Sequence, residues 1–293
     1  MGTSNSYGGQ GGGTPLIPSW LGPDPQAPAA PLVPLGPDPG PIDLTAPAIP
    51  PAPERPAMPA AADPKRFSGT RGNFTRFVSS GGGDRRSLGR AVSGYVSRSA
   101  GGAKQAAQRM GSSRAAGAGL LRFLTSAVSG GVREALRALN LESLAGRPIE
   151  EIFLGLTDYV CPDGGTVDEG IAREAFIETI ADLAESGITD LDSLTIDQTQ
   201  TIFELYATNA IEARLCNDIG ANAINLPSDA QQVAEIQSQL RDFISRGVAD
   251  ALTSARAALQ ALTPENVLGF VNSVYEQAFG ILQSLGESEA DRA

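Results

Sequence analysis

Residues that could do enzyme chemistry are scarce in this chain of 293 residues, which contains two cysteines and no histidine. Without histidine there is no Ser-His-Asp or Cys-His hydrolysis, no histidine proton relay and no histidine-bound zinc. Cys161 and Cys216 lie 55 positions apart, so they form no CxxC pair for metal or redox chemistry. Asp190, Asp192 and Asp197 lack the glycine and glutamate that a calcium loop requires. We therefore expect a non-enzymatic protein, with no catalytic residue, metal or cofactor.

The two thiols have different surroundings in the sequence. Cys216 falls on an apolar stripe with helical spacing, where a cysteine is expected to be a small buried hydrophobe. Cys161 precedes Pro162 in a predicted loop and could be a reactive thiol, but no residue near it in sequence would lower its pKa.

The most distinctive reactive group is an amine at the start of the chain. A small Gly2 after Met1 should allow removal of the methionine, which exposes a glycine α-amine. An α-amine has a pKa near 7.7–8.0 against about 10.4 for lysine, so its free-base fraction at neutral pH is several hundredfold larger. Only two lysines, Lys65 and Lys104, would compete. Gly2 is thus the predicted modification site, the alternative being an ordinary disordered end without a role.

Residues just after Gly2 could bind the protein that modifies it. Thr3, Ser4 and Ser6 are small, so the tip could enter a narrow active site, and we expect these side chains to contact the partner. The apolar stretch that follows contains the one tryptophan of the chain. It is either a stray hydrophobic patch or a docking motif, and a rigid aromatic between prolines, which binds with little entropy loss, favours docking. The predicted docking residues of this stretch are Pro15, Leu16, Pro18, Trp20 and Leu21.

The first residues also fit a lipidation pattern. Met1 to Ser6 matches M-G-x-x-x-[ST], and one acyl chain with a polybasic stretch would anchor a protein to a membrane. The pattern is short, and the Pro-, Ala- and Arg-rich composition is typical of a GC-rich bacterium, where that modification is not expected. No segment reaches the ~18 consecutive apolar residues of a membrane span, and Met1–Gly13 lacks the regions of a secretory signal. We expect a cytoplasmic protein that makes no membrane contact.

Composition divides the chain into three parts, the first of which carries the Gly2 amine and the predicted docking residues. Residues 1–64 hold 17 of the 21 prolines, which predicts a disordered tail with a Gly-rich tip, the PLIPSWL motif and a Pro/Ala spacer. Residues 64–140 carry fourteen basic and two acidic side chains, whereas residues 141–293 carry seven and twenty-six. The predicted domains after the tail are a basic, partly helical segment at 65–117 and an acidic helical domain at 118–293.

Capping signals and apolar periodicity predict the helices of the acidic domain. Thr166–Glu169 and Thr195–Gln198 match capping boxes followed by apolar residues at helical spacing, and Gly187 would end the first of these helices. Ser228–Gln231 is a third box, and Thr263-Pro264-Glu265 is a fourth predicted start with proline at the first helical position. No segment shows sustained period-two alternation. The predicted fold class is all-α, an antiparallel helical bundle preceded by a long disordered Gly/Pro-rich tail.

The basic segment mixes its arginines with the aromatic residues Phe67, Phe74, Phe77 and Tyr95. This mixture resembles a segment that tracks phosphates and stacks on bases. The alternative function is therefore a nucleic-acid-binding module that uses residues 65–137. Against it, the acidic body would repel a polyanion and could itself occupy the basic stretch.

Seven stretches of the chain have a distinctive sequence. They are Met1–Gly9, Pro15–Leu21, Arg71–Phe77, Gly101–Ala103, Arg109–Arg114, Ala145–Pro148 and Ile177–Glu185. These stretches resemble the QatB family of the bacterial Qat anti-phage cassette. The resemblance covers the start of the chain and most of the part predicted to fold, whereas the proline spacer carries none of it.

The resemblance implies a setting of four proteins: a QatA-like ATPase, this B component, a QueC-like (QatC-like) enzyme and a TatD-like nuclease. QueC relatives activate a 7-deazaguanine carboxylate with ATP and pass it to an amine. By that analogy Gly2 would carry a 7-deazaguanine amide, and the helical body would dock the ATPase. The function implied is a non-enzymatic component of an anti-phage defence system, with the nuclease as a further candidate partner.

Overall fold

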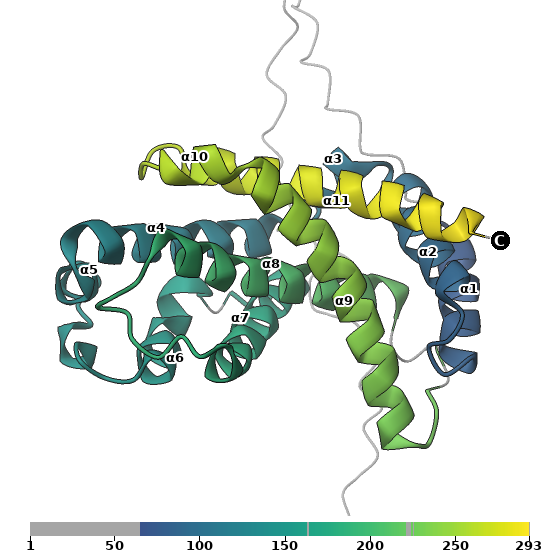
Figure 1. Ribbon diagram of the computed structural model, residues 1–293, viewed down its shortest axis with the longest axis horizontal. Coiled ribbons are helices and arrows are strands. Elements are labelled where there is room, and N and C mark those ends of the chain that lie inside the picture. The colour runs from purple at the N-terminus through teal and green to yellow at the C-terminus, as the bar shows by residue number, and fades with distance from the viewer. Residues whose placement is uncertain (1–64, 163, 221–223, 225, 293) are drawn as a thin grey trace, which may run out of the picture. The chain divides into compact units, whose positions relative to one another are not determined.

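Helices make up nearly all the regular structure of the residues that the computed structural model describes, which are 65–162, 164–220, 224 and 226–292 (Figure 1). No strand occurs among them, so the all-α prediction is confirmed. None of their helices is long and apolar enough to cross a membrane. The predicted disordered tail, residues 1–64, lies outside the described residues. The elements in chain order are α1 (Ser68–Ser79), α2 (Arg85–Gly94), the π-helix η2 (Tyr95–Ala100), α3 (Ala103–Gln108), α4 (Gly111–Gly130), α5 (Val132–Ala138), the 3-10 helix η3 (Glu142–Leu144), α6 (Ile149–Val160), α7 (Val167–Ser186), α8 (Ile196–Ile219), α9 (Ala230–Ser254), α10 (Arg256–Gln260) and α11 (Val267–Asp291).

Consecutive long helices pack against one another. Helix α7 contacts α8, and α8 contacts α9, as expected for helices joined by short connections. Helix α11 contacts α9 and also reaches α2, α3 and α4, and Figure 1 shows it running beside α2. The bundle prediction is confirmed, and α11 is one of the elements that join the first helices to the later ones.

One hydrophobic cluster extends from Phe67 to Leu282. The ring of Tyr95 in η2 lies 6.2 Å from that of Phe67 and 6.5 Å from that of Phe279 in α11. Residues on both sides of position 117 thus share one core, and the division into a basic segment and an acidic domain stays a prediction about charge. All four aromatic residues of the basic segment are buried in this cluster: Phe67, Phe74, Phe77 and Tyr95.

Two helix starts and one helix end agree with the sequence signals. Thr166 and Glu169 form a reciprocal capping box at α7, and Thr195 and Gln198 form one at α8. Gly187 ends α7 with a φ of 74°, a left-handed conformation that glycine adopts without steric cost. These predictions are confirmed because each depends on hydrogen bonds between residues that are near neighbours in sequence.

The predicted capping box at the start of α9 is wrong. The N-cap is Asp229, whose carboxylate accepts a hydrogen bond from the backbone N of Gln231 at 2.9 Å. Ser228 lies one residue before it. Serine and aspartate are comparable N-caps, so their adjacency left the choice to local geometry.

The predicted start of α11 at Thr263-Pro264-Glu265 is also wrong. The helix begins at Val267, with Asn266 as its N-cap residue, and Pro264 lies in the preceding turn. Oδ1 of Asn266 accepts a hydrogen bond from the backbone N of Thr263 at 2.8 Å. This side-chain contact closes a turn where the sequence indicated the first turn of a helix.

Two glycines allow α2 and α11 to cross closely. A Cβ built on Gly89 would lie 2.6 Å from the backbone oxygen of Gly286, and the converse distance is also 2.6 Å. Glycine costs a helix about 1 kcal/mol relative to alanine, and the close contact offsets that cost here. The crossing fixes the position of α2, which carries Arg85, Arg86 and Arg90.

Candidate functional site

The residues predicted to be modified or to dock a partner lie outside the described part of the chain. Chemically distinctive groups within residues 65–292 occur in four places: two thiols, an ion-pair junction, an arginine-rich region and a pocket. The predicted residues outside are Gly2, Thr3, Ser4, Ser6, Pro15, Leu16, Pro18, Trp20 and Leu21.

Neither thiol is placed for nucleophilic chemistry. Burial raises the pKa of Cys161 to about 12, and its Sγ lies 3.5 Å from the backbone oxygen of Ala172. Burial also raises the pKa of Cys216 to about 12, with Glu212 adding to the effect. Both thiols are therefore protonated at neutral pH, and Cys216, which was expected to be buried, is half-buried against the core. Among the described residues no group of three or more potential ligands could hold a metal ion.

A half-buried junction joins η2, α4, α7 and α8. Arg214 of α8 pairs with Asp168 at 2.9 Å and with Asp218 at 3.3 Å, and its side chain is only 14% exposed. The hydroxyl of Tyr95 donates to Asp218 at 2.9 Å, and the backbone N of Ser112 donates to Asp168 at 2.8 Å. One arginine of the acidic part of the chain thereby holds helices from both parts together.

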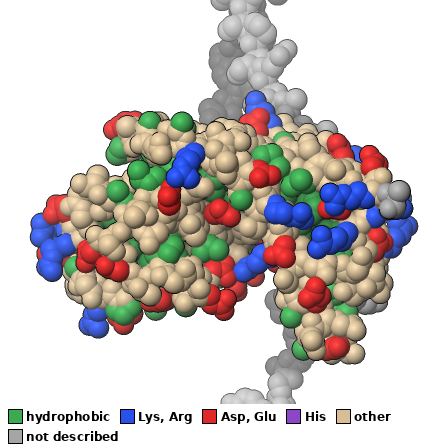
Figure 2. All heavy atoms as spheres, viewed as in Figure 1, with side chains coloured by type: hydrophobic (Ala, Val, Ile, Leu, Met, Phe, Trp, Pro, Cys, Tyr) green, Lys and Arg blue, Asp and Glu red, His purple; other side chains and the backbone are tan. Residues whose placement is uncertain are grey.

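The arginines of the first helices have no such partners. Ten arginines lie between residues 66 and 122, and none is in an ion pair with another described residue. After residue 130 every arginine except Arg246 is in an ion pair: Arg133, Arg137, Arg147, Arg173, Arg214, Arg241, Arg256 and Arg292. We call residues 66–122 the unpaired-arginine region. In Figure 2, basic side chains gather where α2, α9 and the end of α11 meet.

Aromatic residues of the unpaired-arginine region do not reach the surface. Phe77 and Tyr95 are fully buried, and Phe67 and Phe74 are 8% and 7% exposed. The guanidinium of Arg66 lies 4.7 Å from the ring centroid of Phe67 and partly covers it. The interpretation of these rings as base-stacking groups is therefore wrong, since the rings belong to the core.

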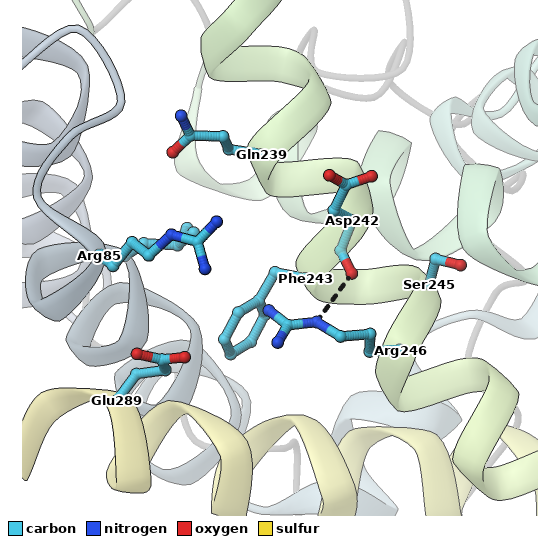
Figure 3. A pocket seen from close by; sticks show the side chains of 8 residues that line it. Arg85, Gln239, Asp242, Phe243, Ser245, Arg246 and Glu289 are labelled. Carbon is cyan, nitrogen blue, oxygen red and sulfur yellow. Dashed lines mark hydrogen bonds between the residues drawn. The ribbon is translucent and has the colours of Figure 1, made fainter. Parts of the chain in front are cut away.

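A pocket of about 370 Å³ opens between α2, α9 and α11 (Figure 3). Arg85 extends into it from α2 and Arg246 from α9. The guanidinium of Arg246 lies 5.4 Å from the ring centroid of Phe243, and its Nε donates to the backbone oxygen of Asp242 at 3.2 Å. Gln239, Asp242, Ser245 and Glu289 are the other polar residues of the lining.

A family model described as "Qat anti-phage system associated protein QatB" matches residues 101–282. The match covers more than half of the chain. The chain belongs to the QatB family. Comparison with curated proteins gave no match, and comparison with solved structures gave none either.

In this QatB family member the matched residues begin after η2 and end within α11. They include Ser112, Asp168 and Arg214 of the junction, and they include Arg246 but not Arg85. Sequence reasoning did not find the pocket. Arg85 and Arg246 are 161 positions apart, and only the folded chain shows that both line one pocket without an ion pair to a described residue.

Proposed function

We propose that this QatB family member is a cytoplasmic, non-enzymatic component of a Qat anti-phage defence system. Its Gly2 amine accepts a 7-deazaguanine acyl group from a QueC-like partner, and its helical body, residues 65–292, docks the ATPase partner. The observation that carries the proposal is the family match over residues 101–282, which supports a role in the Qat system. The sequence adds an acceptor suited to the chemistry, because a free glycine α-amine is less protonated at neutral pH than a lysine.

The proposed step is an acyl transfer from an ATP-activated carboxylate. The nitrogen of Gly2 attacks the carbonyl carbon of the acyl-adenylate, the C–N bond forms, and the C–O bond to AMP breaks. The amine proton passes to solvent. The competing acceptors are Lys65 and Lys104, which are both exposed, so an experiment has to distinguish three amines.

Intact mass of the full chain produced with the QueC-like enzyme tests this step. We expect one adduct on the wild-type chain and on Gly2→Ala, which keeps a small residue and a primary amine. Gly2→Pro should carry none, because its amine is secondary and hindered. The double variant Lys65→Arg with Lys104→Arg should keep the adduct. An unmodified wild-type chain, or an adduct on Gly2→Pro, would show that Gly2 is not the acceptor.

Docking of the tail and docking of the body can be separated by two variants. Trp20→Ala should lower the yield of adduct, because the anchor for the QueC-like enzyme is lost, and leave co-purification of the ATPase unchanged. The double variant Arg86→Glu with Arg90→Glu should reduce co-purification of the ATPase and leave the yield of adduct unchanged. Both of these exposed arginines lie on α2 in the unpaired-arginine region. If the ATPase no longer co-purified with the Trp20→Ala variant, the assignment of ATPase docking to the helical body would be contradicted.

Nucleic-acid binding by residues 65–137 is the second candidate function, favoured by the ten arginines without ion pairs. With the aromatic rings buried, such binding would involve phosphates alone and would show no sequence preference. We expect affinity for two unrelated DNA duplexes to be equal and to fall steeply between about 50 and 200 mM salt. Fluorescence anisotropy measures this. A preference for one duplex at physiological salt would place nucleic-acid binding ahead of the defence-component proposal.

A further inference from the structure

The pocket between α2, α9 and α11 contains the guanidinium groups of Arg85 and Arg246 together with the carboxylates of Asp242 and Glu289. Neither Arg85 nor Arg246 is in an ion pair within the described residues, and both are exposed to solvent through the mouth of the pocket. Figure 3 shows their side chains directed into the same space from opposite walls. Each guanidinium has several N–H groups free for a ligand.

The charge of the pocket is positive. Glu289 is 8% exposed, and its carboxylate pairs with Arg292 at 3.0 Å, so its charge is already compensated. Asp242 offsets one of the two pocket arginines. One net positive charge therefore remains among the groups that line the pocket.

The pocket also has an unused acceptor. Oε1 of Gln239 is buried and has no hydrogen-bond partner among the described residues, while its Nε2 donates to Glu235 at 2.7 Å. A Cβ built on Gly82 would lie 3.1 Å from Nε2 of Gln239, so the glycine turn before α2 lies directly against this amide. A buried acceptor without a partner costs free energy, which a ligand donor would recover once the Gln239 side chain turns toward the pocket.

We propose that this pocket binds a small phosphate ester, with its phosphate between Arg85 and Arg246 and a sugar hydroxyl donating to Gln239. Two forked cations suit a phosphate dianion, whose three free oxygens accept more N–H groups than the two oxygens of a carboxylate. The Gln239 acceptor requires a hydrogen-bond donor on a part of the ligand away from the phosphate. A sugar phosphate or a nucleotide has such a donor in its sugar hydroxyls, whereas inorganic phosphate has no group outside the phosphate itself. A volume of about 370 Å³ lies within the range of small-molecule sites.

Isothermal titration calorimetry of the full chain at low salt tests the assignment, with AMP, ribose 5-phosphate, inorganic phosphate and succinate as probes. AMP and ribose 5-phosphate should bind. Arg85→Gln or Arg246→Gln should lower the affinity for each of them by about tenfold or more, because a charge-assisted contact is lost. Arg90→Gln is the matched control. It removes the same charge from the same helix as Arg85→Gln without lining the pocket, and should change affinity by less than about twofold. Circular dichroism verifies that the variants keep their helices.

Gln239→Leu separates the two halves of the proposed contact. This variant should lower the affinity for AMP and for ribose 5-phosphate by about tenfold. It should leave the weaker affinity for inorganic phosphate unchanged. Equal affinity for succinate or inorganic phosphate would overturn the assignment of a phosphate ester. Absence of binding, or an equal loss in Arg90→Gln, would overturn the site itself. Gly2→Pro should bind as the wild type does, so the outcome is independent of the modification at Gly2.

Discussion

The two parts of the folded chain use arginine in opposite ways. After residue 130, several arginines form ion pairs that join one helix to another. Arg241 of α9, for example, pairs with Asp182 of α7 at 2.8 Å and with Glu212 of α8 at 3.2 Å. Between residues 66 and 122, ten arginines make no ion pair with any described residue, and the buried aromatic residues of the same segment hold it to the core.

This difference separates charges that stabilise the fold from charges that remain available to a partner. An arginine enclosed between two carboxylates has its charge satisfied within the molecule. An unpaired arginine on the surface costs little and contributes little to folding, but it adds to the electrostatic potential that an anion meets. The contacts that hold the first helices are thus mainly apolar, whereas the later helices are also joined by ion pairs.

The largest expected effect tests whether the first helices share the core. Phe77→Ala should destabilise the described unit by about 3–5 kcal/mol, because the fully buried ring leaves a cavity. Its neighbour Arg76→Gln, exposed and without an ion pair, should stay within about 0.5 kcal/mol. Urea unfolding followed by circular dichroism measures both. If Phe77→Ala melted only a minor fraction of the helix signal, residues 65–117 would be a separate unit.

The next effect concerns the junction. Arg214→Gln should cost about 2–3 kcal/mol, since it leaves Asp168 and Asp218 half-buried without their cation. The control is Arg137→Gln, whose exposed pairs with Glu134 and Glu142 are expected to contribute less than about 1 kcal/mol. Equal losses of unfolding free energy in the two variants would mean that burial does not determine how much an ion pair stabilises this fold.

A smaller effect depends on pH. Burial raises the pKa of Glu204 above its ordinary value, and a hydrogen bond from Ser245 opposes the shift only in part. The folded chain therefore holds this proton more tightly than the unfolded chain, so the charged carboxylate lowers stability increasingly as pH rises above the unfolded pKa. Glu204→Gln should raise the Tm at pH 7 and leave it nearly unchanged near pH 4. The exposed variant Glu185→Gln should show no such difference, and a Tm gain for Glu204→Gln that is equal at both pH values would contradict the sign.

The smallest effect is expected where arginines are unpaired. Arg90→Gln and Arg122→Gln remove exposed charges with no ion pair among the described residues, so each should change the free energy of unfolding by less than about 0.5 kcal/mol. Thermal unfolding measures this directly. A loss of 2 kcal/mol or more, roughly what a buried pair contributes, would mean that these arginines stabilise the fold after all.

Short-range signals in the sequence determined the helical class and several helix ends. The boxes at Thr166 and Thr195 and the stop at Gly187 were predictable because their hydrogen bonds and dihedral angles involve residues within one helical turn. At α9 two adjacent residues could each cap the helix, and at α11 a side chain closed a turn that excluded Pro264 from the helix.

Only the tertiary structure decided what the charged and aromatic residues do. A run of arginines and aromatic rings has the same sequence whether the rings stack on bases or fill a core, and the answer came from the contact of Tyr95 with Phe279. The same holds for residues that are far apart in the chain. Only the folded structure pairs Arg214 with Asp168 and places Arg85 and Arg246 in the lining of one pocket. Sequence spacing specifies which charges exist, whereas folding specifies which of them are neutralised.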